Sequence, residues 1–304
     1  MKMAQGNVFG AAAPILVGFL TLAGVMGKAV EAAPITFNTA LAVSEGEVLF
    51  RQQGIWVHVS DDPTGLGREL NAYTSVSVLG YGLTPKLALF GVLPVTRKEL
   101  QTPAGKRKAQ GLGDARIFAR YTVLQKDQAG QTFRISPFAG LELPTGDNDE
   151  TDRLGRLPVK LQTGSGALDI FGGVVMTFAT TDYQIDMSIS YQDNREADNI
   201  ELGNVFKADA SLQYRVWPTE LTAATDSFLF AVLEANLLHE EETTIGGISQ
   251  SNSGGTTLFI SPGIQYAAKT WIAEAAVQLP VVQNLGGTQL EKDFIARASM
   301  RLNF

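Results

Sequence analysis

The carboxyl-terminal stretch shows a clear alternation of hydrophobic and polar positions. From Phe294 to Phe304 every second residue is apolar, and Ile295 is the only apolar residue among those between them. Successive side chains of a strand point to opposite faces of a sheet, so this period of two predicts a strand with one apolar face.

The same alternation recurs along most of the chain. The lengths of the alternating segments are close to the roughly 9–11 residues that a tilted strand needs to cross a bilayer. We count twelve such segments, although ten or fourteen strands also fit the pattern. The predicted strands are residues 47–59, 69–80, 87–98, 112–125, 132–143, 166–180, 183–193, 204–217, 227–239, 256–268, 271–283 and 291–304.

The connections between these segments alternate in length. Those after the odd-numbered strands tend to be long or charged, including a basic loop predicted at residues 99–111. Those after the even-numbered strands are short, except for residues 218–226. Long loops at one end and short turns at the other, together with an even strand count, are typical of bacterial outer-membrane barrels. The sequence therefore predicts an all-β fold, a transmembrane antiparallel up-and-down β-barrel.

Charged residues in the better-patterned strands share one parity. A charge facing lipid at mid-depth costs about 2–4 kcal/mol, so we assign these side chains to the barrel interior. They are Asp114, Arg116, Arg120, Arg134, Glu142, Asp169, Asp186, Lys207, Asp209, Arg215, Glu234, Glu274, Arg297 and Arg301. We expect Arg116, Arg120 and Arg134 to form a basic strip near Glu142, facing Asp209, Glu234 and Glu274.

Aromatic residues share this inward parity. They are Phe90, Phe118, Phe138, Phe171, Phe230 and Phe259. Inward phenylalanines indicate either packing at a constriction or a path for apolar or aromatic solutes. The charged residues, in turn, either brace the wall or contact a solute. The candidates for a solute path are Arg116, Arg120, Arg134, Glu142, Asp209, Glu234, Glu274, Arg297, Arg301, Phe118 and Phe138.

The amino terminus has the features of a targeting segment. Residues 8–26 are mostly apolar and small, and Val30-Glu31-Ala32 is a small-residue cleavage site. We predict a signal peptide over residues 1–32 and a barrel over residues 33–304, with an uncleaved anchor as the alternative. Residues 33–46 have no clear pattern and would form either a periplasmic lead or a plug at the lumen mouth.

Composition excludes several classes of chemistry. The chain of 304 residues has no cysteine and only two histidines, His58 and His239, so thiolate sites and histidine-rich metal sites lack material. The net charge of −7 argues against nucleic-acid binding. No P-loop, GxSxG or helix-opening GxGxxG motif is present. We expect no enzyme activity, no catalytic residue, no metal and no cofactor. A calcium loop at Asp147–Asp152 and a barrel esterase using His239 are weaker alternatives.

Short motifs carry a family resemblance. Residues 143–147 read Leu-Pro-Thr-Gly-Asp, residues 163–166 read Thr-Gly-Ser-Gly, and residues 111–114 read Gly-Leu-Gly-Asp. Together they resemble the meta-pathway phenol-degradation family of outer-membrane proteins. The resemblance implies a barrel that passes small hydrophobic or aromatic compounds across the outer membrane. From physics alone, Pro144 to Asp147 is a turn.

The sequence leads to one preferred function. We expect an outer-membrane channel or facilitator for small solutes, with a closed structural or ligand-binding barrel as the alternative and a soluble secreted β-sandwich as the third. The expected partners are membrane lipid, a small-molecule solute and the barrel-assembly machinery, because the terminal Phe304 looks like the assembly signal of such barrels. The oligomeric state and the solute remain open.

Overall fold

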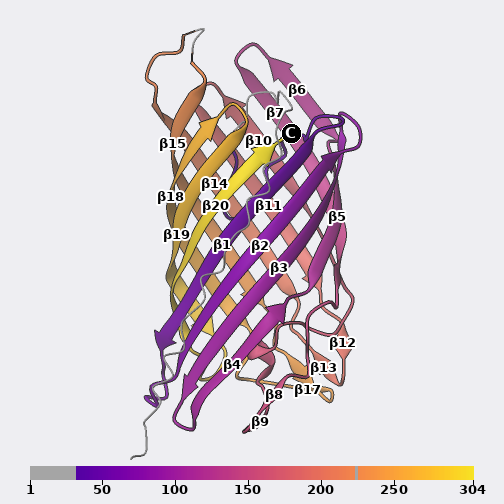
Figure 1. Ribbon diagram of the computed structural model, residues 1–304, viewed down its shortest axis with the longest axis vertical. Helices are drawn as coiled ribbons and strands as arrows, with labels where there is room; N and C mark the ends of the chain where they lie inside the picture. Colours follow the sequence, from indigo (N-terminus) through magenta and orange to yellow (C-terminus); the bar gives the residue numbers. More distant parts are fainter. Residues whose placement is uncertain (1–31, 223–224) are drawn as a thin grey trace, which may run out of the picture.

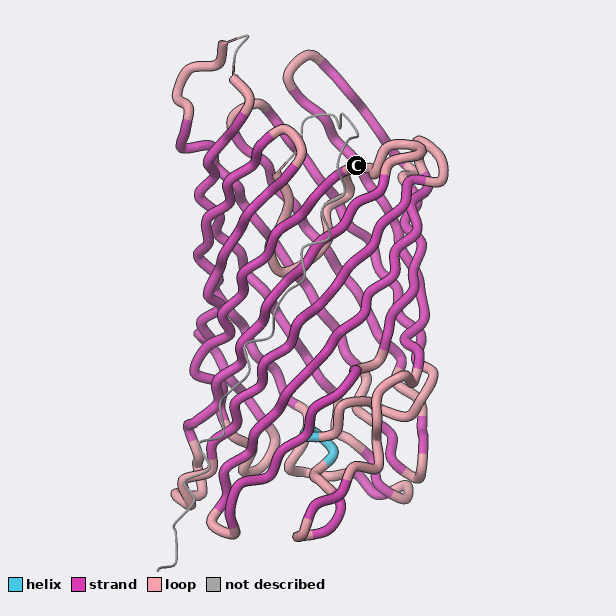
Figure 2. Tube along the Cα trace, viewed as in Figure 1, coloured by secondary structure: helices cyan, strands magenta, loops and turns pink. Residues whose placement is uncertain are grey.

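The computed structural model describes residues 32–222 and 225–304. Within them the chain is almost entirely strand and loop, with one short 3-10 helix, η1, at Val159–Leu161 (Figures 1 and 2). No helix in this part of the chain is long and apolar enough to cross a membrane. The predicted signal peptide lies almost wholly outside the described residues, at 1–31, and remains a prediction.

Twelve strands form a closed antiparallel barrel, as predicted. Each strand pairs with its neighbours in chain order, and the last strand pairs with the first. The strands are β1 (Val48–Asp61), β2 (Glu69–Gly82), β3 (Leu87–Thr102), β5 (Ala115–Tyr121), β7 (Gln131–Leu143), β10 (Asp169–Thr180), β11 (Tyr183–Asp193), β14 (Val205–Trp217), β15 (Ser227–Glu240), β18 (Gly255–Ala268), β19 (Trp271–Leu285) and β20 (Glu291–Asn303). Closure leaves no unpaired edge strand in the barrel wall.

The prediction of a loop at residues 99–111 is wrong, because these residues form most of a β-hairpin. β3 continues to Thr102 and turns into β4 (Gly105–Leu112), which pairs back along it. Ala109 of this hairpin packs with Leu157 and Leu161 in a small apolar cluster. Charged side chains do not prevent strand formation in this hairpin, because the hairpin projects beyond the barrel into water. The predicted strand at 112–125 is likewise interrupted, because β5 ends at Tyr121 and β6 (Leu124–Gln128) pairs with the start of β7.

The two ends of the barrel differ as predicted (Figure 1). The end that holds the carboxyl terminus has mostly short turns. The other end carries β4 and small strands within its longer loops, which we assign to the cell exterior by the usual polarity of such barrels. These small strands are β8 (Thr151–Asp152), β9 (Gly155–Arg156), β12 (Glu196–Ala197), β13 (Ile200–Glu201), β16 (Thr244–Ile245) and β17 (Ile248–Ser249).

The apolar parity of the strands faces outward. Large hydrophobic side chains such as Leu89, Ile117, Ile189, Leu233 and Ile264 remain more than 40% exposed on a single chain. Polar side chains of the opposite parity are buried, and Ser136, Thr177, Asp186, Gln213 and Gln265 are completely inaccessible. An apolar exterior around a polar interior is the pattern of an outer-membrane β-barrel, and it places the protein in the outer membrane.

The stretch before β1 lies inside the barrel. Ala32, Ala33, Ile35, Ala40, Leu41 and Val43 are all buried, against residues from many strands of the wall. Of the two alternatives predicted for residues 33–46, the structure therefore has a plug. We call residues 32–46 the plug; its far end joins the short-turn end of the wall, where the Gly46 amide donates to the Gly82 carbonyl (2.8 Å).

Candidate functional site

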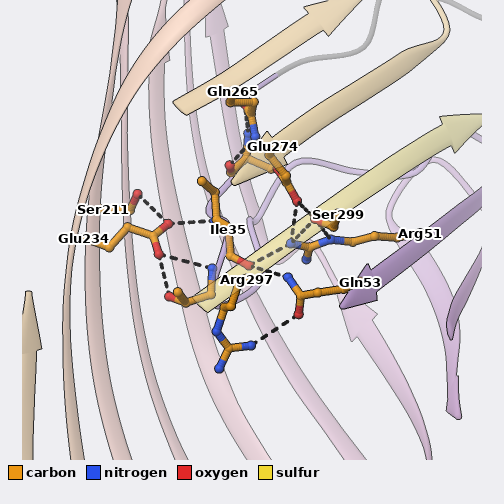
Figure 3. A network of polar contacts seen from close by, with 11 residues as sticks. Ile35, Arg51, Gln53, Ser211, Glu234, Gln265, Glu274, Arg297 and Ser299 are labelled. Atoms are coloured by element: carbon orange, nitrogen blue, oxygen red, sulfur yellow. Dashed lines mark hydrogen bonds and ion pairs between the residues drawn. The ribbon is translucent and has the colours of Figure 1, made fainter. Parts of the chain in front are cut away.

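Glu234 of β15 binds the first arm of the plug, at Ile35 and Thr36 (Figure 3). Its Oε1 accepts from the Ile35 amide (2.7 Å) and from the Ser211 hydroxyl (3.1 Å). Its Oε2 accepts from the Thr36 amide (3.1 Å) and the Thr36 hydroxyl (2.6 Å). A buried carboxylate is tolerated when its oxygens are saturated with donors, and both oxygens are saturated here.

Residues of β1 and β18 bind the same part of the plug. Arg51 donates to the Ile35 carbonyl (2.7 Å) and pairs with Glu274 (2.5 Å), while Gln53 donates to the same carbonyl (3.2 Å) (Figure 3). Gln265 accepts from the Ala33 amide (3.2 Å) and donates to the Ala33 carbonyl (2.9 Å). The plug is thus tied to β1, β15 and β18 by hydrogen bonds to its backbone, which depend little on its own side chains.

The returning arm of the plug is bound by β5, β7 and β10. Arg120 donates to the Thr39 carbonyl (2.5 Å) and the Leu41 carbonyl (2.6 Å), with its guanidinium 4.9 Å from the centre of the Phe90 ring. The Ala40 amide donates to the Thr177 hydroxyl (2.8 Å), and Ser136 donates to the Ala40 carbonyl (3.2 Å). Between the two arms, Phe37 and Asn38 form the tip of the plug.

Three cavities lie along the lumen. A periplasmic vestibule of about 560 Å³ is bounded by both arms of the plug. A central chamber of about 350 Å³ follows it, and an outer vestibule of about 650 Å³ lies under the long loops. The plug tip, Phe37 and Asn38, borders both the periplasmic vestibule and the chamber. Arg116 and Lys207 border both the chamber and the outer vestibule. The cavities therefore follow one another in series, with the plug tip between the first two.

The chamber has an aromatic wall. Phe118 makes edge contacts with Phe138 and Phe171, with ring centres 6.2 and 5.9 Å apart, and these rings come from neighbouring strands β5, β7 and β10. The Arg116 guanidinium stands 5.3 Å from the centre of the Phe171 ring, within the range of a cation–π contact. Phe259 of β18 and Phe37 of the plug also border the chamber.

The remaining wall of the chamber is mainly basic. Arg116, Lys207, Lys292 and Arg297 border it, against a single carboxylate, Asp209. Arg116 pairs with Glu142. Arg297 donates to the amide oxygens of Gln278 (2.6 Å) and Gln53 (3.3 Å), and Asp209 accepts from Asn236 (2.9 Å).

The predicted solute-path residues all lie inside the barrel but not together. Arg120, Arg134, Glu274 and Arg301 border the periplasmic vestibule. Arg116, Asp209, Arg297, Phe118 and Phe138 border the chamber, and Glu142 the outer vestibule. Glu234 is bound to the plug. The basic strip expected from Arg116, Arg120 and Arg134 is divided, because Arg120 is bound to the plug and Arg134 lies near Asp127 (3.8 Å).

Lys207, Phe171 and Phe259 border the chamber although they were not among the predicted solute-path residues. Their inward parity was visible in the sequence. Their depth along the barrel axis could not be predicted, because it depends on the stagger between strands and on where the plug ends.

Ion pairs order the outer loops. Arg107 of β4 donates to both carboxylate oxygens of Asp152 (2.9 Å each) and holds the pKa of that carboxyl below its usual range. Lys160 of η1 borders the outer vestibule, and burial lowers the pKa of its ammonium. The Asp152 carboxylate is therefore paired with Arg107. Among the described residues, no three His, Cys, Asp or Glu side chains lie together as a group that could hold a metal ion.

The three short motifs noted in the sequence meet at one place. Asp114 accepts from the amides of Gly146 (2.9 Å) and Ser165 (2.6 Å). Thr145 donates to the Gly113 carbonyl (2.8 Å) and accepts from the Ala115 amide (2.9 Å). We call this the Asp114 junction. It fixes the long loop 144–168 against the start of β5, which is a structural role.

The histidines do not form a catalytic group. His239 accepts from or donates to Thr256 (2.8 Å), and His58 lies beside Asn71 (3.0 Å) and near Asp293 (3.8 Å). Both are on strand faces of outward parity, on β15 and β1, away from the cavities described above. The residues that border the three cavities therefore form a candidate solute path.

Comparison with solved structures finds the same fold in an outer-membrane channel. The COG4313 outer membrane channel from Pseudomonas putida F1 superimposes with a TM-score of 0.70 at 14% identity, over 90% of this chain and 100% of that one. The β domain of the Bordetella autotransporter BrkA gives a TM-score of 0.47 at 12% identity, over 86% and 100%. No curated protein shows significant similarity in sequence.

A family is nevertheless recognisable from the sequence. The family model described as "Putative MetA-pathway of phenol degradation" matches residues 60–281, which is most of the chain and includes the Asp114 junction. This agrees with the resemblance seen in the short motifs. The chain belongs to this family.

Proposed function

We propose that the protein is an outer-membrane channel for the diffusion of small solutes, including hydrophobic or aromatic compounds. The observation that carries this proposal is the series of three cavities along the lumen, which share bordering residues. The Pseudomonas putida F1 protein of the same fold is described as a channel. The family description refers to phenol degradation, which is consistent with aromatic solutes.

The plug tip lies between the first two cavities of this path. Phe37 and Asn38 make no side-chain hydrogen bond to any described residue, and Asn38 is exposed inside the barrel. The tip can therefore be changed without removing an anchor of the plug. Solutes would pass beside these two side chains.

Planar-bilayer conductance and liposome uptake of the purified protein test the proposal. Phe37→Ala should raise the single-channel conductance, because it removes a ring from the constriction while Glu234 and Arg120 still hold the plug. Leu83→Ala, a truncation in an exposed turn at the same end, is the matched control and should leave conductance unchanged. A protein that neither conducts nor transports in either form would contradict the proposal.

The alternative is a ligand-binding barrel with a closed lumen. The plug favours it, because more than ten hydrogen bonds and several apolar contacts hold residues 32–46 in the lumen. A sealed protein that still binds small molecules would support this alternative.

A further inference from the structure

The central chamber combines uncompensated positive charge with an aromatic wall. Among the described residues, no group forms a hydrogen bond or an ion pair with the Lys207 ammonium, although this residue borders both the chamber and the outer vestibule. An ammonium has three donors and no acceptor. Its donors are therefore available to a group that enters from outside.

Arg297 has spare donors as well. A guanidinium has five N–H donors, and the two bonds described for Arg297 go to neutral amides, Gln278 and Gln53. No carboxylate lies within ion-pair distance of it in the part of the chain that the structure describes. The one carboxylate at the chamber, Asp209, is bonded to Asn236 (2.9 Å). Arg116 is paired with Glu142, so Lys207, Lys292 and Arg297 against Asp209 leave the chamber positive.

The two neighbouring cavities do not share this imbalance. The outer vestibule is bordered by four basic residues, Lys98, Arg116, Lys160 and Lys207, and by four acidic ones, Asp114, Glu142, Glu240 and Glu241. The periplasmic vestibule has four basic residues and three acidic ones. An anion moving along the lumen would therefore meet its most favourable field in the chamber.

The chamber is suited to a ring as well as to a charge. Phe118, Phe138 and Phe171 offer ring faces and edges on the side formed by β5, β7 and β10, whereas Arg297 and Lys207 come from β20 and β14. Aromatic pairs in offset or edge geometry contribute about 0.5–1.5 kcal/mol beyond burial. The volume of about 350 Å³ is at the lower end of the range for small-molecule sites.

We propose that the central chamber is a binding site for an aromatic carboxylate, with the ring against Phe118, Phe138 and Phe171 and the carboxylate held by Lys207 and Arg297. This rests on the proposed function only in that it names the class of solute. Binding itself does not require that the barrel conduct.

Calorimetric titration of the detergent-solubilised full-length protein tests this proposal with three probes. Benzoate has the ring and the negative charge, acetate has the charge without the ring, and benzylammonium has the ring with the opposite charge. We expect benzoate to bind at least tenfold more tightly than either of the others, and to bind more weakly as salt is added. Equal affinities for benzoate and benzylammonium, or no binding of benzoate, would overturn the site.

Variants locate the binding. Lys207→Met keeps the length of the side chain and should weaken benzoate about tenfold, which is about 1.4 kcal/mol. Lys86→Met, on an exposed turn, is the matched control and should bind as the unaltered protein does. If Lys207→Met does not fold, as judged by heat-dependent mobility, Arg297→Gln replaces it, and the three-probe comparison decides in any case. Benzoate affinity unchanged in the folded chamber variant would overturn the assignment.

Conductance measured on the same preparation separates the two proposals. A sealed protein that binds benzoate selectively contradicts the channel and leaves the site standing. A conducting protein without selective benzoate binding contradicts the site and leaves the channel standing.

Discussion

Buried polar side chains in this barrel are stabilised by one another and by the plug. Glu234 is the clearest case, since four donors surround its two oxygens and two of these donors are plug amides. These bonds give the plug amides their acceptors and give the Glu234 carboxylate its donors. A partly satisfied network of this kind costs more than an apolar one, so the contact is sensitive to small chemical changes.

Glu234→Gln should loosen the plug with little change in size. The glutamine amide would place an N–H donor against the amides of Ile35 and Thr36, which leaves at least one buried donor without an acceptor. We expect a loss of about 1–3 kcal/mol in the free energy of unfolding and a higher or noisier conductance. Denaturant titration and bilayer recording measure the two effects. Glu220→Gln, in the exposed loop after β14, is the control, and identical behaviour of both variants would contradict the role of Glu234.

At the residue level, the sequence predicted which way a side chain points but not what it touches. Period two fixed the inward parity of Arg116, Arg120 and Arg297, and all three lie inside. Their different surroundings follow from the plug, whose residues 33–46 carry no periodic pattern. Irregular backbone that is bound by other strands leaves no periodic pattern in its own sequence, so the binding of Arg120 to plug carbonyls could not be foreseen.

At the level of elements, the strands could be predicted from the sequence because one face of each strand contacts lipid and the other faces the polar lumen. β11 begins and ends at the predicted residues, Tyr183 and Asp193. The errors lie beyond the bilayer, where β3 and β4 extend as a hairpin. There the apolar and polar sides both face water or loops, so alternation no longer distinguishes strand from loop.

The Asp114 junction should tolerate no side chain at Gly164. A Cβ there would lie 2.5 Å from the carbonyl carbon of Gly146 and 2.7 Å from Oδ1 of Asp114, so backbone has to move. We expect Gly164→Ala to lower the free energy of unfolding by about 1–3 kcal/mol, which is typical of overpacking. Denaturant titration of the refolded protein measures it.

The matched control is Gly91→Ala on β3. A Cβ at Gly91 would meet no atom within 4 Å, and the residue already lies in a strand. Gly91→Ala should therefore have little effect on unfolding. An equal loss in both variants would indicate that glycine is needed for general strand or loop reasons and not for close approach at the junction.

The whole molecule depends on pairing between its two ends. β20 pairs with β1 along almost its full length, and the chain's last residue completes this seam. The Phe304 amide donates to the Val48 carbonyl (2.9 Å), and the Val48 amide donates to the Phe304 carbonyl (3.0 Å). Because these bonds use backbone atoms, the Phe304 side chain is not required for closure itself.

Phe304→Ala should separate assembly from stability. We propose that the barrel-assembly machinery recognises the aromatic ring of Phe304, and we therefore predict that the variant crosses the inner membrane normally but reaches the outer membrane at a reduced level. Refolded in detergent, it should unfold like the unaltered protein, since the seam bonds with Val48 remain. Phe294→Ala is the control, as it removes an aromatic side chain from the same strand and the same outward face without changing the terminus. Membrane fractionation and denaturant titration measure the two properties. Normal outer-membrane levels of Phe304→Ala would contradict the assembly role, and a matching loss of stability in vitro would show that the ring acts in the folded barrel instead.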